Sequence, residues 1–287
     1  MRINFSKIKA FADLIRLQSQ TGTVLLMMPI LWSLVIAANG QPPMRFVVVF
    51  VLGAFLMRSA GCVINDVFDS DIDQKVARTQ RRPLPSGRLS RIEALLFFSF
   101  LISCAMTLLI FLNLLTVILS VGAVILAVLY PFSKRIIPIP QAVLGIAFGW
   151  GSIMAWAAVK DTVELPAVLI FLATVCWAIG YDTIYAIQDK NDDRLIGVGS
   201  AALYFGKRAW LAIAIVFSGM MLCLIFVGIL QDLSHWFFIS LIIVYIVMAI
   251  QSYMVKRGVS CEEAFDMFRS HAWIGLVVFL GCLVGIK

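Results

Sequence analysis

Residues 65–73 concentrate oxygen ligands at the end of a long apolar run. The stretch reads Asn-Asp-Val-Phe-Asp-Ser-Asp-Ile-Asp and holds four carboxylates and one amide. On an α-helix, Asn65, Asp69 and Asp73 lie on one stripe, with Asp66 beside them. Carboxylates at this spacing repel unless a cation lies between them, and oxygen ligands without His or Cys favour Mg²⁺ or Ca²⁺ over Zn²⁺. The pattern therefore predicts a magnesium–diphosphate site at a membrane surface.

A second acidic stretch, residues 182–193, also follows an apolar run and reads Asp-Thr-Ile-Tyr-Ala-Ile-Gln-Asp-Lys-Asn-Asp-Asp. Asp182, Tyr185, Asp189 and Asp193 fall on one helical face. One acidic loop would be ordinary. Two such clusters on the same side of a membrane, each followed by basic residues, indicate a shared polar cavity.

Basic residues accompany these clusters. Residues 78–87 read Arg-Thr-Gln-Arg-Arg-Pro-Leu-Pro-Ser-Gly, a composition suited to holding a diphosphate beside a metal. Within the second apolar run, Arg58 costs about 2.5–3.5 kcal/mol on insertion scales, so it faces either a wet cavity or an anion. Snorkelling to the membrane surface is an equally good explanation of Arg58.

The composition is that of a polytopic membrane protein. Hydrophobic residues make up 62% of the 287, charged residues 14%, and the mean hydropathy is +0.99. Nine apolar runs approach the ~20 residues that cross the hydrocarbon. They are centred on 23–38, 46–64, 94–112, 114–130, 141–159, 165–187, 209–230, 234–254 and 271–286. Two of these runs follow each other at Asn113 with almost no loop between them, which leaves eight spans as an alternative.

The connections between the apolar runs are alternately rich and poor in Lys and Arg. If there are nine spans, nineteen basic residues share one face and three lie on the other. The positive-inside rule then puts the N-terminus and both acidic stretches in the cytoplasm and the C-terminus outside. An eight-span count breaks this alternation. The net charge of +7 reflects this topology and requires no nucleic-acid partner.

The chain resembles the UbiA-type membrane prenyltransferases over nearly its whole length. The motifs that carry the resemblance are N-D-x-x-D-x-x-x-D at 65–73, R-T-x-x-R-P-L-P-S-G at 78–87, Y-P-x-x-K-R at 130–135 and D-T-I-Y-A-x-Q-D-K-x-D-D at 182–193. The last is similar to the branch that prenylates 4-hydroxybenzoate for ubiquinone. The resemblance implies a single all-α domain over residues 1–287, with nine transmembrane helices around a central cavity capped by the two acidic loops. It implies a bacterial inner-membrane location.

The resemblance also implies roles for individual residues. Mg²⁺ is the expected cofactor, and a polyprenyl diphosphate, 4-hydroxybenzoate and membrane lipid are the expected partners. The expected metal ligands are Asn65, Asp66, Asp69 and Asp73 for one ion and Asp189 and Asp193 for a second. The expected diphosphate contacts are Arg78, Arg82, Lys134 and Lys190. Asp182 or Tyr185 would orient the phenol, and Arg135 or Arg58 would pair with the acceptor carboxylate, with Arg135 favoured.

Three features of the sequence differ from the family. Ser19-Gln20-Thr21-Gly22, Ser70 and Gly199 depart from the family pattern, although none removes a metal ligand. Dihydroxynaphthoate, homogentisate or haem is the alternative acceptor. A cation transporter is the alternative from another class, but it should carry acidic residues near the middle of its spans. The sequence carries no signal for an oligomeric state.

Overall fold

The structure, a computed structural model, is composed of α-helices and two short 3₁₀ turns in the residues that it describes, 5–74, 79–196 and 199–287. Side chains are described throughout these ranges except at positions 5, 72, 134–135 and 191–196. The elements are α1 (Phe5–Leu14), α2 (Thr21–Ala37), α3 (Met44–Asp73), α4 (Arg91–Leu108), η1 (Leu109–Phe111), α5 (Leu114–Ile136), α6 (Pro140–Lys160), α7 (Leu165–Ile196), α8 (Ala201–Phe205), η2 (Gly206–Arg208), α9 (Ala209–Leu230), α10 (His235–Arg257) and α11 (Cys261–Gly285).

Nine of the described helices correspond to the nine predicted spans. Eight of them are long and apolar enough to cross a membrane, and α2, with 17 residues, is a shorter apolar helix. The division at Asn113 is confirmed, because the Asn113 side chain accepts a hydrogen bond from the Thr116 amide and so starts α5. The prediction of an all-α membrane fold is therefore confirmed.

The acidic stretches are helical where the structure describes them, as their one-face spacing predicted, so the acidic loops that the resemblance implied are the ends of two helices. Helix α3 has 30 residues and α7 has 32, well beyond the ~20 that cross the hydrocarbon. Their last turns carry the acidic residues, so the carboxylates are fixed on rigid helix ends. The last membrane helix also starts earlier than predicted, at Cys261, where Ser260 and Glu263 form a capping box.

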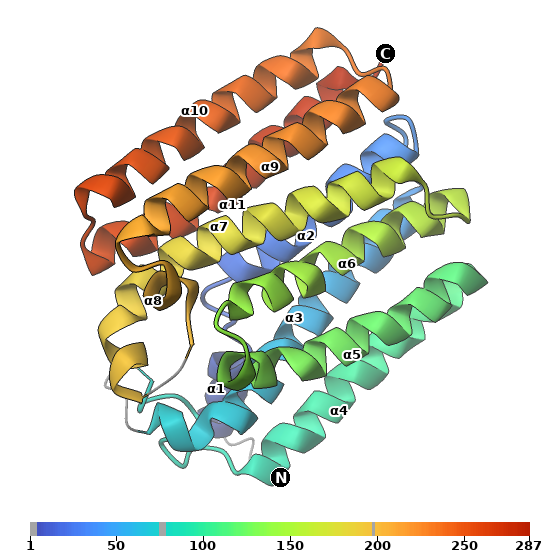
Figure 1. Cartoon of the computed structure of the whole chain (residues 1–287). Helices are drawn as coiled ribbons and strands as arrows, with labels where there is room; N and C mark the ends of the chain where they lie inside the picture. The colour runs from blue at the N-terminus through green and yellow to red at the C-terminus, as the bar shows by residue number, and fades with distance from the viewer. Residues whose placement is uncertain (1–4, 75–78, 197–198) are drawn as a thin grey trace.

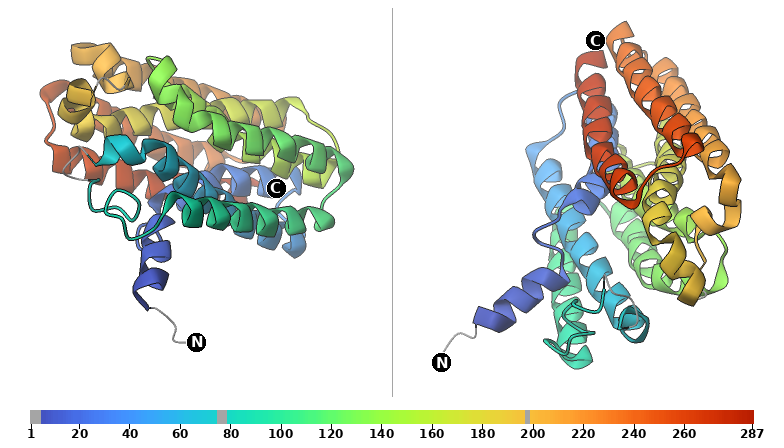
Figure 2. Two further views of the ribbon diagram at one scale, coloured as in Figure 1. Left: turned by 90° about the horizontal axis from the view of Figure 1, so that it is seen from below. Right: turned by 90° about the vertical axis from the view of Figure 1, so that its left-hand side faces the viewer.

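The helices lie side by side in a bundle with α7 at its centre (Figure 1). Helix α7 packs against α2, α6, α9 and α11, and α5 packs against α6. Helices α4 and α5 form one edge of the bundle, and few of their side chains are buried. Helix α1 projects from the body of the bundle on the side where α3 ends (Figure 2).

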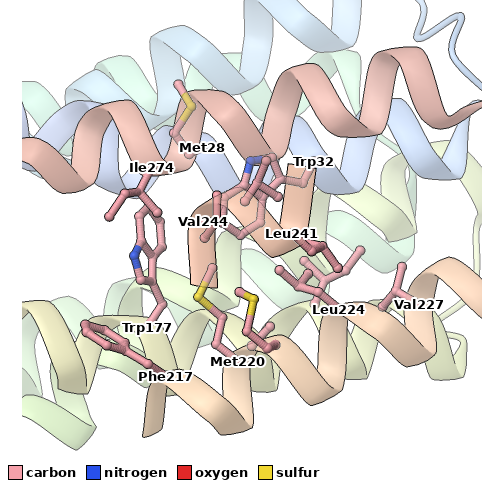
Figure 3. Close-up of a cluster of buried hydrophobic side chains, with 14 of the residues drawn as sticks. Met28, Trp32, Trp177, Phe217, Met220, Leu224, Val227, Leu241, Val244 and Ile274 are labelled. Atoms are coloured by element: carbon pink, nitrogen blue, oxygen red, sulfur yellow. The ribbon is translucent and has the colours of Figure 1, made fainter. Parts of the chain in front are cut away.

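The main hydrophobic core lies between α2, α7, α9, α10 and α11 (Figure 3). Trp32 and Trp177 are fully buried there, with ring centroids 5.3 Å apart. Their indole nitrogens donate to the Gly275 carbonyl at 3.0 Å and to His271 Nδ1 at 2.9 Å. Because these bonds satisfy polar atoms inside the core, they hold α7 in a defined position beside the cavity described next.

Candidate active site

A cavity of about 420 Å³ opens between α2, α3, α4, α5, α6 and α7. One end is polar and lies where α3 and α7 reach the same side of the bundle. Its polar lining includes Arg16, Arg58, Asn65, Asp66, Arg82, Tyr130, Tyr181, Asp182 and Tyr185. The cavity thus brings together both acidic stretches, as their positions in the sequence predicted.

Asp66 is the most enclosed carboxylate at the polar end, with a fully buried side chain. Arg16 Nη2 donates to both of its oxygens, at 2.6 and 2.9 Å. Arg82 Nη1 lies 3.3 Å from Asp66 Oδ1. A buried carboxylate is strongly destabilising without a cationic partner, so the two guanidinium groups stabilise the Asp66 carboxylate in this position.

Arg82 also links two turns of α3, because its Nη1 lies 2.8 Å from Asp73 Oδ2 as well. Burial raises the pKa of the Asp73 carboxyl above its ordinary value, although Arg82 acts in the opposite direction. The loop that carries Arg82 is tied to α1, since Arg88 Nη1 donates to Asp13 Oδ2 at 2.7 Å. In its described part the loop places the Arg82 guanidinium on the acidic end of α3, and its predicted contact with a diphosphate stays a prediction.

Sequence reasoning missed Arg16, whose basic charge was attributed to topology. Arg16 follows α1 with φ 57°, a left-handed conformation that is uncommon for a residue with a side chain. This turn reverses the chain between α1 and α2 and directs the guanidinium at Asp66. Burial lowers the pKa of Arg16, but the charge and hydrogen bonds of Asp66, together with Cys62 and Asp73, outweigh burial, so the pKa lies above its ordinary value.

The second acidic stretch contributes Asp182 and Tyr185 to the cavity wall. The Tyr185 ring packs on Phe268, with centroids 4.7 Å apart, and this contact fixes the direction of its hydroxyl. Tyr181, one position before Asp182, also lines the cavity and was not predicted. Its hydroxyl is buried and has no hydrogen-bond partner among the described residues, so it is an unsatisfied polar atom in the cavity wall.

Arg58 lies in the wall of the same cavity. This position favours the wet-cavity explanation of Arg58 over snorkelling. Its Nη1 donates to Cys62 Sγ at 2.6 Å, and no carboxylate of the described residues forms an ion pair with it. Gly22 makes room for the group: a Cβ at Gly22 would lie 2.6 Å from Arg58 Nε. Arg58 is therefore a cation that faces the cavity and is available to an anion.

The other end of the cavity is apolar. Its lining includes Leu26, Ile30, Phe50, Ala54, Met57, Met106, Leu109, Leu112, Val124, Phe148 and Met154. From Asn65 back to Phe50, α3 advances about 22 Å at 1.5 Å per residue. A hydrocarbon chain whose polar head lies at Asn65 and Asp66 can extend along this wall.

The remaining predicted residues are distributed as follows. Asp69 and Asp73 are buried beside Asp66 on α3, and Asp189 and Lys190 are half-buried on α7, but none of these four lines the cavity as described. Arg78 lies outside the described residues. The side chains of Lys134, Arg135 and Asp193 are not described, so their predicted roles stay predictions.

The donors at the polar end suit Mg²⁺, because Asn65 and Asp66 supply only oxygen ligands and Mg²⁺ uses one or two carboxylates together with substrate oxygens. Among the described residues, no three His, Cys, Asp or Glu side chains converge on one point. The cation positions around Asp66 are instead taken by the guanidinium groups of Arg16 and Arg82.

Comparisons with known proteins agree with this geometry. A sequence model of the UbiA prenyltransferase family matches residues 26–272. A protein of Serratia proteamaculans named 4-hydroxybenzoate octaprenyltransferase is 41% identical over 279 residues, which is 97% of this chain and 96% of the relative. A UbiA homologue of Aeropyrum pernix has the same fold, with a TM-score of 0.79 and 23% identity over 94% of this chain and 100% of that one. A UbiA homologue of Archaeoglobus fulgidus, solved with GPP and Mg²⁺, superposes with a TM-score of 0.68 and 14% identity over 96% and 99% of the two chains.

Proposed function

Since this chain belongs to the UbiA prenyltransferase family, we propose that it transfers a polyprenyl group from an allylic diphosphate to 4-hydroxybenzoate, with Mg²⁺ as cofactor. The product would be a ubiquinone precursor. Residues 1–287 would act as one transmembrane domain in the bacterial inner membrane, with the polar end of the cavity towards the cytoplasm.

The observation that carries this proposal is the change in polarity from one end of the cavity to the other. Carboxylate, amide and guanidinium groups line one end, and hydrocarbon side chains line the other. An allylic polyprenyl diphosphate changes in the same way along its length, from a charged diphosphate to a hydrocarbon chain. The apolar walls also exclude water from the allylic carbon, so a carbocation formed there would meet the acceptor before it met a hydroxide or water molecule.

The polar end would stabilise the leaving group. Asn65, Asp66, Asp69 and Asp73 on α3, and Asp189 and Asp193 on α7, would hold Mg²⁺, which when bound neutralises negative charge on the diphosphate. Arg82 would donate to the remaining diphosphate oxygens, as would Arg78, Lys134 and Lys190. Arg16 lies beside Asp66 and joins this set. The allylic C–O bond would break with both electrons leaving on the diphosphate.

The acceptor would lie between Arg58 and Asp182. Arg58 is the described candidate for the partner of the benzoate carboxylate, because its guanidinium faces the cavity without a described carboxylate partner. Arg135, whose side chain is not described, remains the alternative. Asp182 would accept the phenolic hydrogen bond and Tyr185 would orient the ring. Electrons of the ring carbon ortho to the hydroxyl would form the new C–C bond, and the proton on that carbon would then pass to the released diphosphate, which restores aromaticity.

The test is an acceptor panel with purified protein. Full-length protein in detergent is given one polyprenyl diphosphate, Mg²⁺ and, separately, 4-hydroxybenzoate, dihydroxynaphthoate or homogentisate. Product from 4-hydroxybenzoate alone supports the proposed acceptor. Product from another acceptor in its place would retain prenyl transfer but reject 4-hydroxybenzoate, and diphosphate release with no prenylated product would reject both.

A further inference from the structure

A second cavity, of about 190 Å³, lies between α9 and α10, away from the central cavity. We refer to it as the α9–α10 groove. Its lining consists of Trp210, Ala214, Phe217, Tyr245, Met248, Ala249, Ser252, Tyr253 and Lys256. We propose that this groove binds an anionic glycerophospholipid, with an acyl chain along the groove and the phosphate at Lys256.

The groove is open to the surroundings of the bundle. Phe217 and Met248 form its floor and are buried, whereas Tyr245 and Tyr253 are 44% and 58% exposed. Ala214 and Ala249 leave room between the two helices because their side chains are single methyl groups. The groove is therefore an apolar slot on a face that a membrane protein presents to lipid tails.

The dimensions of the groove match one leaflet of a bilayer. Its lining on α10 runs from Tyr245 to Lys256, which corresponds to about 16 Å along the helix. Half of the ~30 Å hydrocarbon core is about 15 Å. At the end of the groove away from Lys256, the Tyr245 hydroxyl oxygen lies 3.3 Å from that of Ser218.

The mouth of the groove carries positive charge. Lys256 Nζ lies 4.8 Å from the centre of the Trp210 ring, a contact that holds the ammonium over the mouth. Lys207 and Arg208, in the turn just before α9, and Arg257, beside Lys256, are exposed at the same end of these helices. Within the described part of the chain, no carboxylate forms an ion pair with any of these four residues.

Unneutralised cations above an apolar slot complement a phospholipid that has net negative charge. Trp and Tyr side chains at the mouth suit the headgroup level of a bilayer, where aromatic rings with a polar atom gather. A zwitterionic headgroup would bring its own cation towards Lys256, so the groove should distinguish the two lipid classes.

The experiment measures lipid binding to the purified full-length protein in neutral detergent by native mass spectrometry. Dioleoyl phosphatidylglycerol and dioleoyl phosphatidylcholine are titrated separately. We expect saturable binding of the first and weaker binding of the second. Lys256→Gln should weaken phosphatidylglycerol binding about fivefold, the usual effect of one cation near an anionic lipid. Lys256→Arg should retain binding, and Ala214→Phe should abolish it by filling the slot.

Arg269→Gln is the matched control. Arg269 lies near the ring of Phe265, at 5.9 Å, but lines neither cavity, so its loss should leave lipid binding unchanged. Lys256 is exposed, so its replacement should not disturb folding even if Ala214→Phe does. Equal affinity of wild type and Lys256→Gln, equal affinity for the two lipids, or displacement of the lipid by excess inorganic phosphate would each overturn the proposal.

Discussion

Gly22→Ala tests the proposed role of Arg58 without removing any charge. In the present structure a Cβ at Gly22 would lie 2.6 Å from Arg58 Nε and 2.8 Å from its Nη2, whereas ordinary contacts begin at 3.4 Å. The guanidinium must therefore move by about 0.8 Å. Hydrogen bonds to charged groups contribute about 1.5–3 kcal/mol, and a shift of this size removes most of a bidentate geometry. We expect the KM for 4-hydroxybenzoate to rise about 10- to 100-fold.

The assay is initial-rate kinetics in which one substrate is varied while the other is saturating. The KM for the polyprenyl diphosphate should change little, because the oxygens of Asp66 are held by Arg16 and Arg82 and not by Arg58. Gly53→Ala is the control. It adds a methyl group to the apolar wall of the same cavity, where the closest atom is Leu108 Cδ1 at 3.9 Å, so any effect should fall on the prenyl substrate. Equal increases in both KM values for Gly22→Ala would refute the assignment of Arg58 to the acceptor.

Three further predictions follow from the proposed site and topology. Excess EDTA should stop turnover, and Asp189→Ala should do the same in Mg²⁺ while the protein stays folded; turnover that continues in EDTA would contradict a metal requirement. Single-cysteine labelling should reach Ser86→Cys only from the cytoplasm and Lys287→Cys only from outside, and the opposite pattern would invert the topology. Arg16→Ala should lower the stability of the metal-free protein by about 3 kcal/mol in denaturant titration, because it takes a partner from buried Asp66. Arg88→Ala, which breaks a more exposed pair with Asp13, should cost at most about 1 kcal/mol; similar losses for the two variants would argue against a structural ion pair at Asp66.

The membrane helices could be predicted because two independent signals agree. Each apolar run has the length that a bilayer requires, and the alternation of basic residues separates α4 from α5 at Asn113 even though the two hydrophobic runs nearly touch. Helix ends beyond the hydrocarbon were harder to predict. Residues 261–270 are polar enough to look like a loop, yet the capping box at Ser260 starts α11 there.

The candidate site was predicted where side-chain chemistry is unusual for a membrane protein. Asp66, Asp182 and Arg58 are expensive to bury, so their presence near apolar runs indicated the cavity that the structure contains. Arg16 and Tyr181 could not be identified in this way. The position of the Arg16 side chain depends on a left-handed turn, which no local sequence pattern predicts. Tyr181 resembles any other aromatic residue of an apolar helix in the sequence, and only the structure shows that its hydroxyl has no partner among the described residues.

The exposed α4–α5 edge has a consequence for how substrates exchange. In water, moving these helices away from α3 and α6 would expose their apolar side chains, but lipid tails solvate such side chains as well as other helices do. Sideways opening of this edge therefore costs only packing contacts. A long prenylated product gains about 0.8 kcal/mol per methylene by staying in lipid, so leaving through water would be prohibitively slow. The enzyme can exchange its long-tailed substrate and product by two-dimensional diffusion within the membrane, and its turnover should respond to the bilayer around it.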